Sequence, residues 1–301
     1  MISFPSFSPI SLQCNVLASK CSVESFPKRN LDFHRNITNF EAQSTIDHMN
    51  AQNYFPTRAT VRSYSDKEIT DTELTQIIEY ATHAPTTGNM QLYSVIVTRS
   101  AEGKERLAPA HFNQPTVKGC SVLLTICADF NRFIKWCEAR NAAPGYDNFQ
   151  SFVTAALDAA ILAQQICTIA EMRGIGCCYL GTTTYNAPDI AKALELPRFV
   201  IPITTLTLGY PATRPEVSDR LPVNAIIHNE RYHDYTPQEI DEAYHEKEAR
   251  EDSARFIAEN GKETLAQVFT DVRYNRANNE HFSKVFYDFI SRQGFQFPTA
   301  D

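Results

Sequence analysis

The sequence predicts an α+β fold in which a mixed sheet is flanked by long helices. Three segments, at 93–99, 120–129 and 197–211, are rich in Val, Ile and Thr and read as strands. A long apolar helix is expected between the second and the third, at 148–173. The elements show no regular β-α-β alternation and the chain has no G-x-G-x-x-G, which disfavours a doubly wound nucleotide-binding fold.

The composition is that of a globular protein. With 301 residues the chain can form one large domain or two small ones, and its 43% of apolar residues can fill a substantial core. The net charge of −7 argues against a general nucleic-acid binder, which needs a basic surface. No run of about 18 apolar residues occurs, so no membrane span is predicted.

Residues 1–48 differ from the rest because they are rich in Ser and Phe and show no sustained period. Two interpretations stay open: a targeting segment, although its signature is poor, or a chain whose natural start is Met49. In the second case 301 − 48 = 253 residues remain. We expect residues 1–48 to be mostly irregular and not needed for catalysis, and residues 49–301 to form the functional domain.

The first helix is predicted at 71–82. It begins with a T-x-x-E capping box made by Thr70 and Glu73, and it ends before Pro85. Its apolar face consists of Leu74, Ile77, Ile78 and Ala81. The strand at 120–129 is apolar throughout, so we expect both of its faces to be buried.

The long helix at 148–173 can be capped by Asn148 and ended by Gly174. Because it is apolar almost all round, it should lie at the centre of the molecule or of a dimer. The remaining predicted elements are a strand at 174–180, a short helix at 187–194, a charged exposed helix at 239–259, and helices at 262–269 and 281–292.

The eight cysteines form no C-x-x-C pair, and no Cys/His cluster has zinc spacing, so no metal site is expected. Several lie in apolar runs, as Cys127 and Cys167 do. Buried free thiols in a reducing compartment are the favoured interpretation, and we expect a cytoplasmic protein. The adjacent Cys177 and Cys178 are interpreted as packing residues.

Three segments carry candidate ligand-binding residues. Arg58, Thr60 and Arg62 place two guanidinium groups and a hydroxyl just before the first long helix, a set that suits a phosphate. The polar turn at 85–91 and the turn at 181–184 each adjoin a strand and can present amides, hydroxyls or backbone N–H groups to a ligand. Taken singly, the arginine segment is better explained by surface charge and the turn at 85–91 by a simple helix-to-strand turn.

Taken together, these segments resemble the nitroreductase family, in particular its NADPH-type oxygen-insensitive nitroreductases and flavin reductases. Four blocks coincide in order: "RATVRSY", "APTTGNMQ", "NQPTVKGCSVLLTICADF" and "GIGCCYLGTTTYN…LPRFVIPITTLTLGYPATRPEVSDRLP". The closing "FYDFISRQGF" is also similar, so the resemblance covers roughly 55 to 298. It implies a mostly antiparallel sheet in a domain-swapped homodimer with FMN bound between the subunits.

The resemblance also implies roles for individual residues. The residues matched to the FMN site are Arg58, Thr60, Arg62, Thr86, Gln91, Gln114, Tyr179, Leu180, Gly181, Thr182 and Arg220, with the backbone of Gly181 and Thr182 near flavin N5. Four positions depart from the subgroup: Ala59 replaces a basic residue, Thr60 a serine whose hydroxyl it keeps, Thr182 a glycine, and Ser218 a lysine. Arg250 and Arg255 resemble the pair that binds the 2′-phosphate of NADPH, although Glu248, Glu251 and Asp252 crowd Arg250.

The implied activity is a ping-pong hydride transfer from NADPH or NADH, through FMN, to a small electron-poor acceptor such as a nitroaromatic, a quinone or a flavin. No Ser-His-Asp set is required for this chemistry. Two alternatives stay open. One is a reductive dehalogenase or flavin-consuming enzyme on the same fold, although no lid residues for such substrates are evident. The other is a flavin-binding protein used for sensing or storage.

Overall fold

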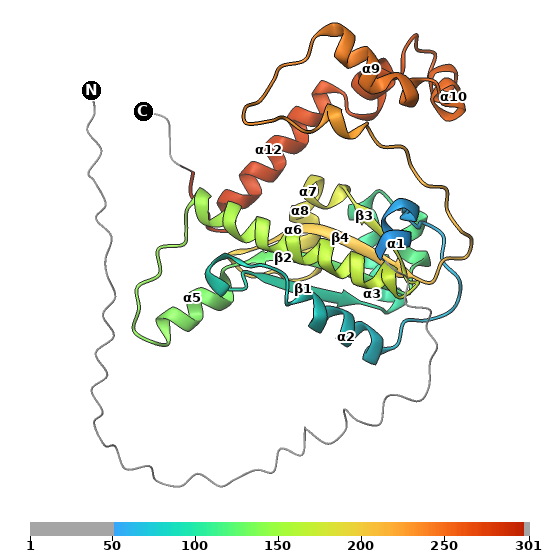
Figure 1. Ribbon diagram of the computed structural model, residues 1–301. Helices are drawn as coiled ribbons and strands as arrows, with labels where there is room; N and C mark the ends of the chain where they lie inside the picture. The colour runs from blue at the N-terminus through green and yellow to red at the C-terminus, as the bar shows by residue number, and fades with distance from the viewer. Residues whose placement is uncertain (1–50, 298–301) are drawn as a thin grey trace, which may run out of the picture. The chain divides into compact units, whose positions relative to one another are not determined.

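The computed structural model describes residues 51–297, and the side chains from Tyr54 onward (Figure 1). The expectations for residues 1–48 and for Met49 lie outside the described residues. A four-stranded antiparallel sheet forms the centre, in the order β1-β2-β4-β3. Its strands are β1 (Tyr93–Thr98), β2 (Val122–Asp129), β3 (Gly176–Leu180) and β4 (Val200–Gly209).

Helices complete the fold. The α-helices are α1 (Ala51–Thr57), α2 (Asp71–Ala81), α3 (Ala101–Leu107), α4 (Pro115–Gly119), α5 (Asn131–Glu138), α6 (Phe149–Met172), α7 (Thr182–Tyr185), α8 (Ala187–Ala193), α9 (Pro237–Glu248), α10 (Glu251–Glu259), α11 (Leu265–Gln267) and α12 (Arg276–Arg292). Short 3-10 helices are η1 (Thr87–Asn89), η2 (Ala108–His111) and η3 (Val223–Ala225), and η4 (Val268–Arg273) is a π-helix.

The central strand β2 is buried on both faces, as predicted. On one face its residues Val122, Leu124 and Ile126 pack against α6 and α2. On the other face Leu123 packs among residues of α3, α4 and α8. The strand pairs with β4 through a bulge at Ile203, next to Pro202, a residue that has no N–H to donate to a regular ladder.

Helix α6 lies along the sheet (Figure 1) and is the predicted core helix. The Asn148 side chain accepts the N–H of Ser151 at the start, and Gly174, with φ of 78°, follows the end. By length and composition alone α6 could cross a membrane. It instead packs on β2, β4 and α2 and buries Asp158 and Glu171, two acids that a lipid-facing helix would not carry.

Several local predictions are confirmed and others are wrong. The capping box of Thr70 and Glu73 is present at the start of α2. The single helix predicted at 239–259 is wrong, because Arg250 is extended (ψ 144°) and separates α9 from α10. The predicted helix at 262–269 begins only at Leu265 and continues as the π-helix η4. The predicted turn at 181–184 is the start of α7.

The segment 58–64 runs beside the edge strand β3, and a glycine makes this approach possible. The Val61 N–H donates to the Cys177 carbonyl at 3.1 Å. A Cβ on Gly176 would lie 2.4 Å from Cγ2 of Val61, far inside contact distance. The close approach places Arg58 and Arg62 next to β3.

We expect Gly176→Ala to lower the free energy of unfolding by about 1–3 kcal/mol, the usual cost of overpacking. Adding Val61→Ala to Gly176→Ala should recover part of the loss, because it removes the clashing methyl groups. Gly145→Ala is the control, since a Cβ there meets nothing within 4 Å. Urea titrations of the four proteins measure the effect, and equal stability of both glycine variants would contradict it.

Candidate functional site

The first predicted segment and β3 come together in the structure. Arg58 donates from Nη1 to Thr60 Oγ1 at 3.2 Å and from Nε to the Glu171 carboxylate at 3.1 and 3.2 Å. Arg62 is exposed beside Cys178; burial raises the pKa of the Cys178 thiol, and the Arg62 guanidinium opposes that rise. Two of the four sequence blocks are therefore neighbours here.

Glu171, near the end of α6, holds the Arg58 side chain in place. Its carboxylate is buried, pairs with Arg58 Nη2 at 3.1 Å and accepts the Tyr54 hydroxyl. Burial, together with the hydrogen bond to Glu171, raises the pKa of Tyr54, so this hydroxyl stays protonated as a donor. Arg58 is thus oriented from two sides, by Glu171 and by Thr60.

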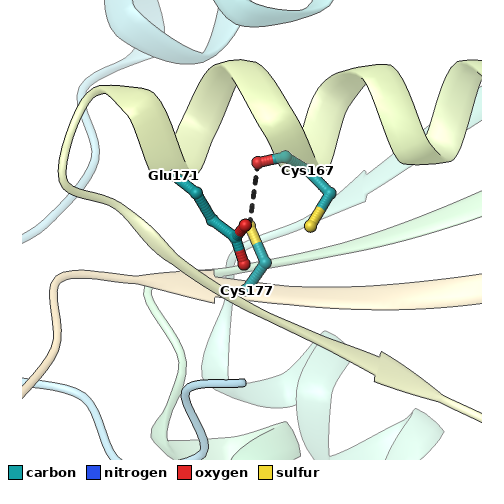
Figure 2. A group of neighbouring side chains, drawn as sticks. All are labelled: Cys167, Glu171 and Cys177. Atoms are coloured by element: carbon teal, nitrogen blue, oxygen red, sulfur yellow. Dashed lines mark hydrogen bonds between the residues drawn. The ribbon is translucent and has the colours of Figure 1, made fainter. Parts of the chain in front are cut away.

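Cys167 and Glu171 project from α6 toward Cys177 of β3, as Figure 2 shows. Their ligand atoms lie within 4.8 Å of one another, a spacing compatible with a metal. However, the Cys177 thiol points at the Cys167 carbonyl at 3.9 Å, and its pKa is raised well above the usual value by the contact with Cys167 and by burial. Arg58 Nη2 lies 3.8 Å from Cys167 Sγ. We therefore assign this cluster to holding the Arg58 cation.

A cavity of 330 Å³ opens beside this pair, and its lining includes Arg58, Ala59, Glu171 and Arg214. Arg214 is exposed and adds a second guanidinium group where Ala59 offers none. Matching the sequence to the subgroup position by position could not show that Arg214 lies near Ala59, because the two residues are more than 150 positions apart in the chain.

The turn between α2 and β1 is built on Asp158 of α6, a side chain only 2% exposed. Its carboxylate accepts the Thr86 hydroxyl at 2.7 Å and the Thr87 N–H at 2.9 Å. Thr86 Oγ1 in turn accepts the Gln91 N–H at 3.0 Å. The Thr86 hydroxyl is therefore used within the turn, whereas the Gln91 side chain is exposed.

The segment that carries Gln114 meets the start of α7. Gln114 is half-buried and precedes α4, after Phe112 and Asn113, which both have positive φ. His111 is fully buried, and its Nδ1 lies 2.9 Å from Thr182 Oγ1. Burial lowers the pKa of His111 to about 4, so the ring is neutral at physiological pH.

The residues at the end of β3 differ in their exposure to solvent. Tyr179 is 37% exposed and its hydroxyl lies 3.4 Å from Gln164 Oε1 of α6, whereas Leu180 is buried. Gly181 is exposed and Thr182 half-buried. The predicted residues 179–182 therefore lie at the same end of β3 as the contact between His111 and Thr182.

The three remaining predicted arginines lie elsewhere. Arg220 donates to the backbone carbonyl of Asp219 at 2.7 Å, Arg250 pairs with Asp252 at 2.9 Å, and Arg255 lies 3.8 Å from Glu259. Within residues 54–297, no hydrogen bond or ion pair joins these three side chains to the Arg58 or Thr182 neighbourhoods.

Sequence reasoning missed Asp158, Glu171 and His111. A signal existed for the first two, because they are the only acidic residues in α6. Acids in an apolar helix need hydrogen-bonding partners, so both positions pointed to contacts with other segments. Nothing in the sequence around His111 indicated a contact with Thr182, 71 residues away.

Comparisons with known proteins agree with this arrangement. The model of the Nitroreductase family matches residues 56–210. The chain is 30% identical over 251 residues to an FMN reductase (NAD(P)H) of Bacillus subtilis (strain 168), covering 79% of this chain and 94% of that protein. It is 30% identical over 173 residues to an oxygen-insensitive NADPH nitroreductase of Salmonella typhimurium, covering 58% and 70%.

Solved structures give the same result. A protein from Bacteroides fragilis NCTC 9343 is 54% identical, with a TM-score of 0.79 over 79% of this chain and 97% of that one. NfrA1 of B. megaterium is 29% identical, with a TM-score of 0.70 over 80% and 96%. The chain belongs to the nitroreductase family, and the expected fold class is confirmed.

His111 should make stability depend on pH. The unfolded chain takes up the His111 proton near pH 6.5, but the folded chain only near pH 4. The free energy of unfolding should therefore fall by up to about 3 kcal/mol as pH drops from 6.5 to 4. His111→Gln should flatten this slope in thermal melts, whereas His83→Gln, at an exposed histidine, should not. A slope unchanged in His111→Gln would refute the assignment.

Proposed function

We propose that this chain is an FMN-dependent NAD(P)H oxidoreductase that reduces small electron-poor molecules. The observation that carries the proposal is the Arg58 guanidinium, oriented by Glu171 and Thr60 beside a cavity and next to Arg62. The relatives named FMN reductase and NADPH nitroreductase support the same cofactor and reductant.

The residues fit FMN in their chemistry. Guanidinium groups suit its phosphate, and hydroxyls and amides suit its ribityl chain and the polar edge of its ring. We assign the phosphate to Arg58, Arg62 and Arg220, the ribityl region to Thr60, Thr86 and Gln91, and the ring to Gln114, Tyr179, Leu180, Gly181 and Thr182. At Thr86 the donor to the ribityl region would be the backbone N–H, because the side-chain hydroxyl already donates to Asp158.

Bound FMN would supply the redox chemistry, accepting a hydride from the nicotinamide and passing it to the acceptor. The chain's own residues bind and orient. Glu171 and Thr60 fix the direction of Arg58, Asp158 fixes the 86–91 turn, and the backbone at Gly181 would hold the ring. Fixed donors of this kind stabilise charge that develops on the ring without reorganising.

We further propose a cytoplasmic, domain-swapped homodimer. Large apolar side chains on the outer side of α6 are exposed, with Leu157 at 57% and Ile161 at 41%. Tyr179, beside the same helix, is also partly exposed. A second copy would cover this surface, which a single chain leaves in water. Residues 1–48 are proposed to be dispensable for both folding and activity.

Rapid bleaching of the yellow protein by NADPH without oxygen, followed by recovery with a quinone, would distinguish an enzyme from a flavin store. Repeating the experiment with NADH and with halogenated or nitro compounds separates the nitroreductase activity from a reductive dehalogenase. Bleaching without recovery by any acceptor would contradict turnover.

Loss of Arg58 should weaken FMN binding by about 1–3 kcal/mol, the usual contribution of a hydrogen bond to a charged group. Arg58→Ala alone would leave Glu171 buried without its partner, so Arg58→Ala with Glu171→Gln is the cleaner variant. Arg220→Ala should cost a similar amount.

Quenching of flavin fluorescence measures these affinities. Arg276→Ala is the control, because its side chain is 90% exposed on α12 and removes the same charge. A purified protein that neither carries FMN nor takes it up on reconstitution would end the hypothesis.

The nicotinamide 2′-phosphate gives a further prediction. Arg250 is already held by Asp252, with Asp219 and Glu216 near it. Arg255 is 62% exposed, and its nearest acid is Glu259 at 3.8 Å. We propose Arg255 as the main contact, so Arg255→Ala should lower the NADPH/NADH ratio of kcat/KM about tenfold, and Arg250→Ala less. Lys284→Ala serves as control. If the wild-type ratio is near one and the double variant Arg250→Ala/Arg255→Ala leaves it unchanged, this segment does not select the nicotinamide.

A further inference from the structure

The contact between His111 and Thr182 joins two segments of the proposed flavin site. Thr182 is the first residue of α7, and the nitroreductase subgroup that the sequence resembles usually has glycine at this position. His111 ends η2, three residues before Gln114. The Asn186 side-chain amide donates to the Ala110 carbonyl at 2.7 Å, a second bond between the same segments. The separation of η2 and α7 is therefore set independently of the His111 ring.

The two ring nitrogens of His111 have different surroundings. Nδ1 lies 2.9 Å from Thr182 Oγ1. Nε2 is buried and has no hydrogen-bond partner among the described residues. The ring is neutral, so one nitrogen carries a proton and the other a lone pair. An unpaired buried N–H is rarer in proteins than an undersatisfied acceptor, so the proton belongs on Nδ1.

This tautomer determines what the Thr182 hydroxyl can do. With Nδ1–H as donor, Thr182 Oγ1 accepts from His111, and its own proton remains available for another acceptor. The neighbouring Thr183 does not compete for it, because its hydroxyl is bound to the Leu180 carbonyl at 2.8 Å and to Thr205. Thr182 is half-buried, so its hydroxyl can reach a ligand at this end of β3.

We propose that His111 is a positioning residue that makes the Thr182 hydroxyl a hydrogen-bond donor to the polar edge of the flavin ring. The inference rests on the proposed function and deepens it. A donor at that edge stabilises the negative charge that reduction places on the ring, so the reduced cofactor is bound more tightly than the oxidised one. The threonine thereby adds a contact that glycine at this position cannot make.

The test compares variants that keep or remove each donor. Thr182→Val removes the hydroxyl at constant shape, and Thr182→Ser keeps it. His111→Leu removes the ring donor, and His111→Asn retains an amide near the position of Nδ1. The midpoint potential of the bound flavin and the affinity for oxidised FMN are measured in each, with thermal melts to confirm folding.

Thr182→Val and His111→Leu should each reduce the preference for reduced over oxidised FMN about tenfold, which is about 30 mV for a two-electron couple. Thr182→Ser and His111→Asn should stay near wild type. The Val and Leu changes combined should cause no further loss, because they interrupt one chain of bonds. In the flavin-free protein, ¹⁵N NMR should place the His111 proton on Nδ1.

A proton on Nε2 would overturn the inference, and so would variants that change the melting temperature while leaving the potential unchanged. These outcomes leave the proposed function intact if wild type binds FMN. A wild type that binds no FMN overturns the proposed function, and the proposed donor falls with it, whatever the tautomer of His111.

Discussion

The site depends on the way α6 lies on the sheet, with one buried carboxylate near its middle and another near its C-terminal end. Asp158 binds the turn that carries Thr86 and Gln91, and Glu171 binds Arg58. The two acids are thirteen residues apart, which is about 20 Å along an α-helix. One rigid helix therefore sets the distance between two loops from which it is far in sequence, and its own position is set by the apolar packing against β2 and β4.

The Arg58–Glu171 pair is better understood as a positioning device than as a source of stability. Burying an ion pair costs about as much as it returns, whereas removing one partner costs about 3–5 kcal/mol. Arg58 has five N–H donors, and its contacts with Glu171, Thr60 and Cys167 involve all three of its nitrogens. One N–H of Nη1 is left by these contacts, and Arg58 lines the cavity, so a site for an anion is compatible with a buried carboxylate next to it.

The parts of the fold that sequence could predict are those decided locally. The capping box of α2, the length of α6 and the two-sided burial of β2 follow from spacing and composition. The break at Arg250 does not follow from spacing or composition; there the Ser253 hydroxyl donates to the Lys247 carbonyl, a contact between α10 and α9. Short helices such as α3 and α5 were not predicted either.

For the site, motif matching supplied candidate residues, but their hydrogen-bonding partners came from distant segments. Glu171 lies 113 residues after Arg58, and Thr182 lies 71 residues after His111.

The homodimer that we propose would also complete the site. Tyr179 contacts Gln164 on α6, so the partly exposed end of β3 adjoins the helix that bears the uncovered Leu157 and Ile161. Among residues 54–297, Arg220, which we assign to the phosphate, has hydrogen bonds only to the backbone of its own segment. Apolar surface of this kind is removed from water by association, and the same association would enclose the ring-facing residues. Cofactor occupancy and oligomeric state should therefore change together, because both depend on the surface shared by α6 and β3.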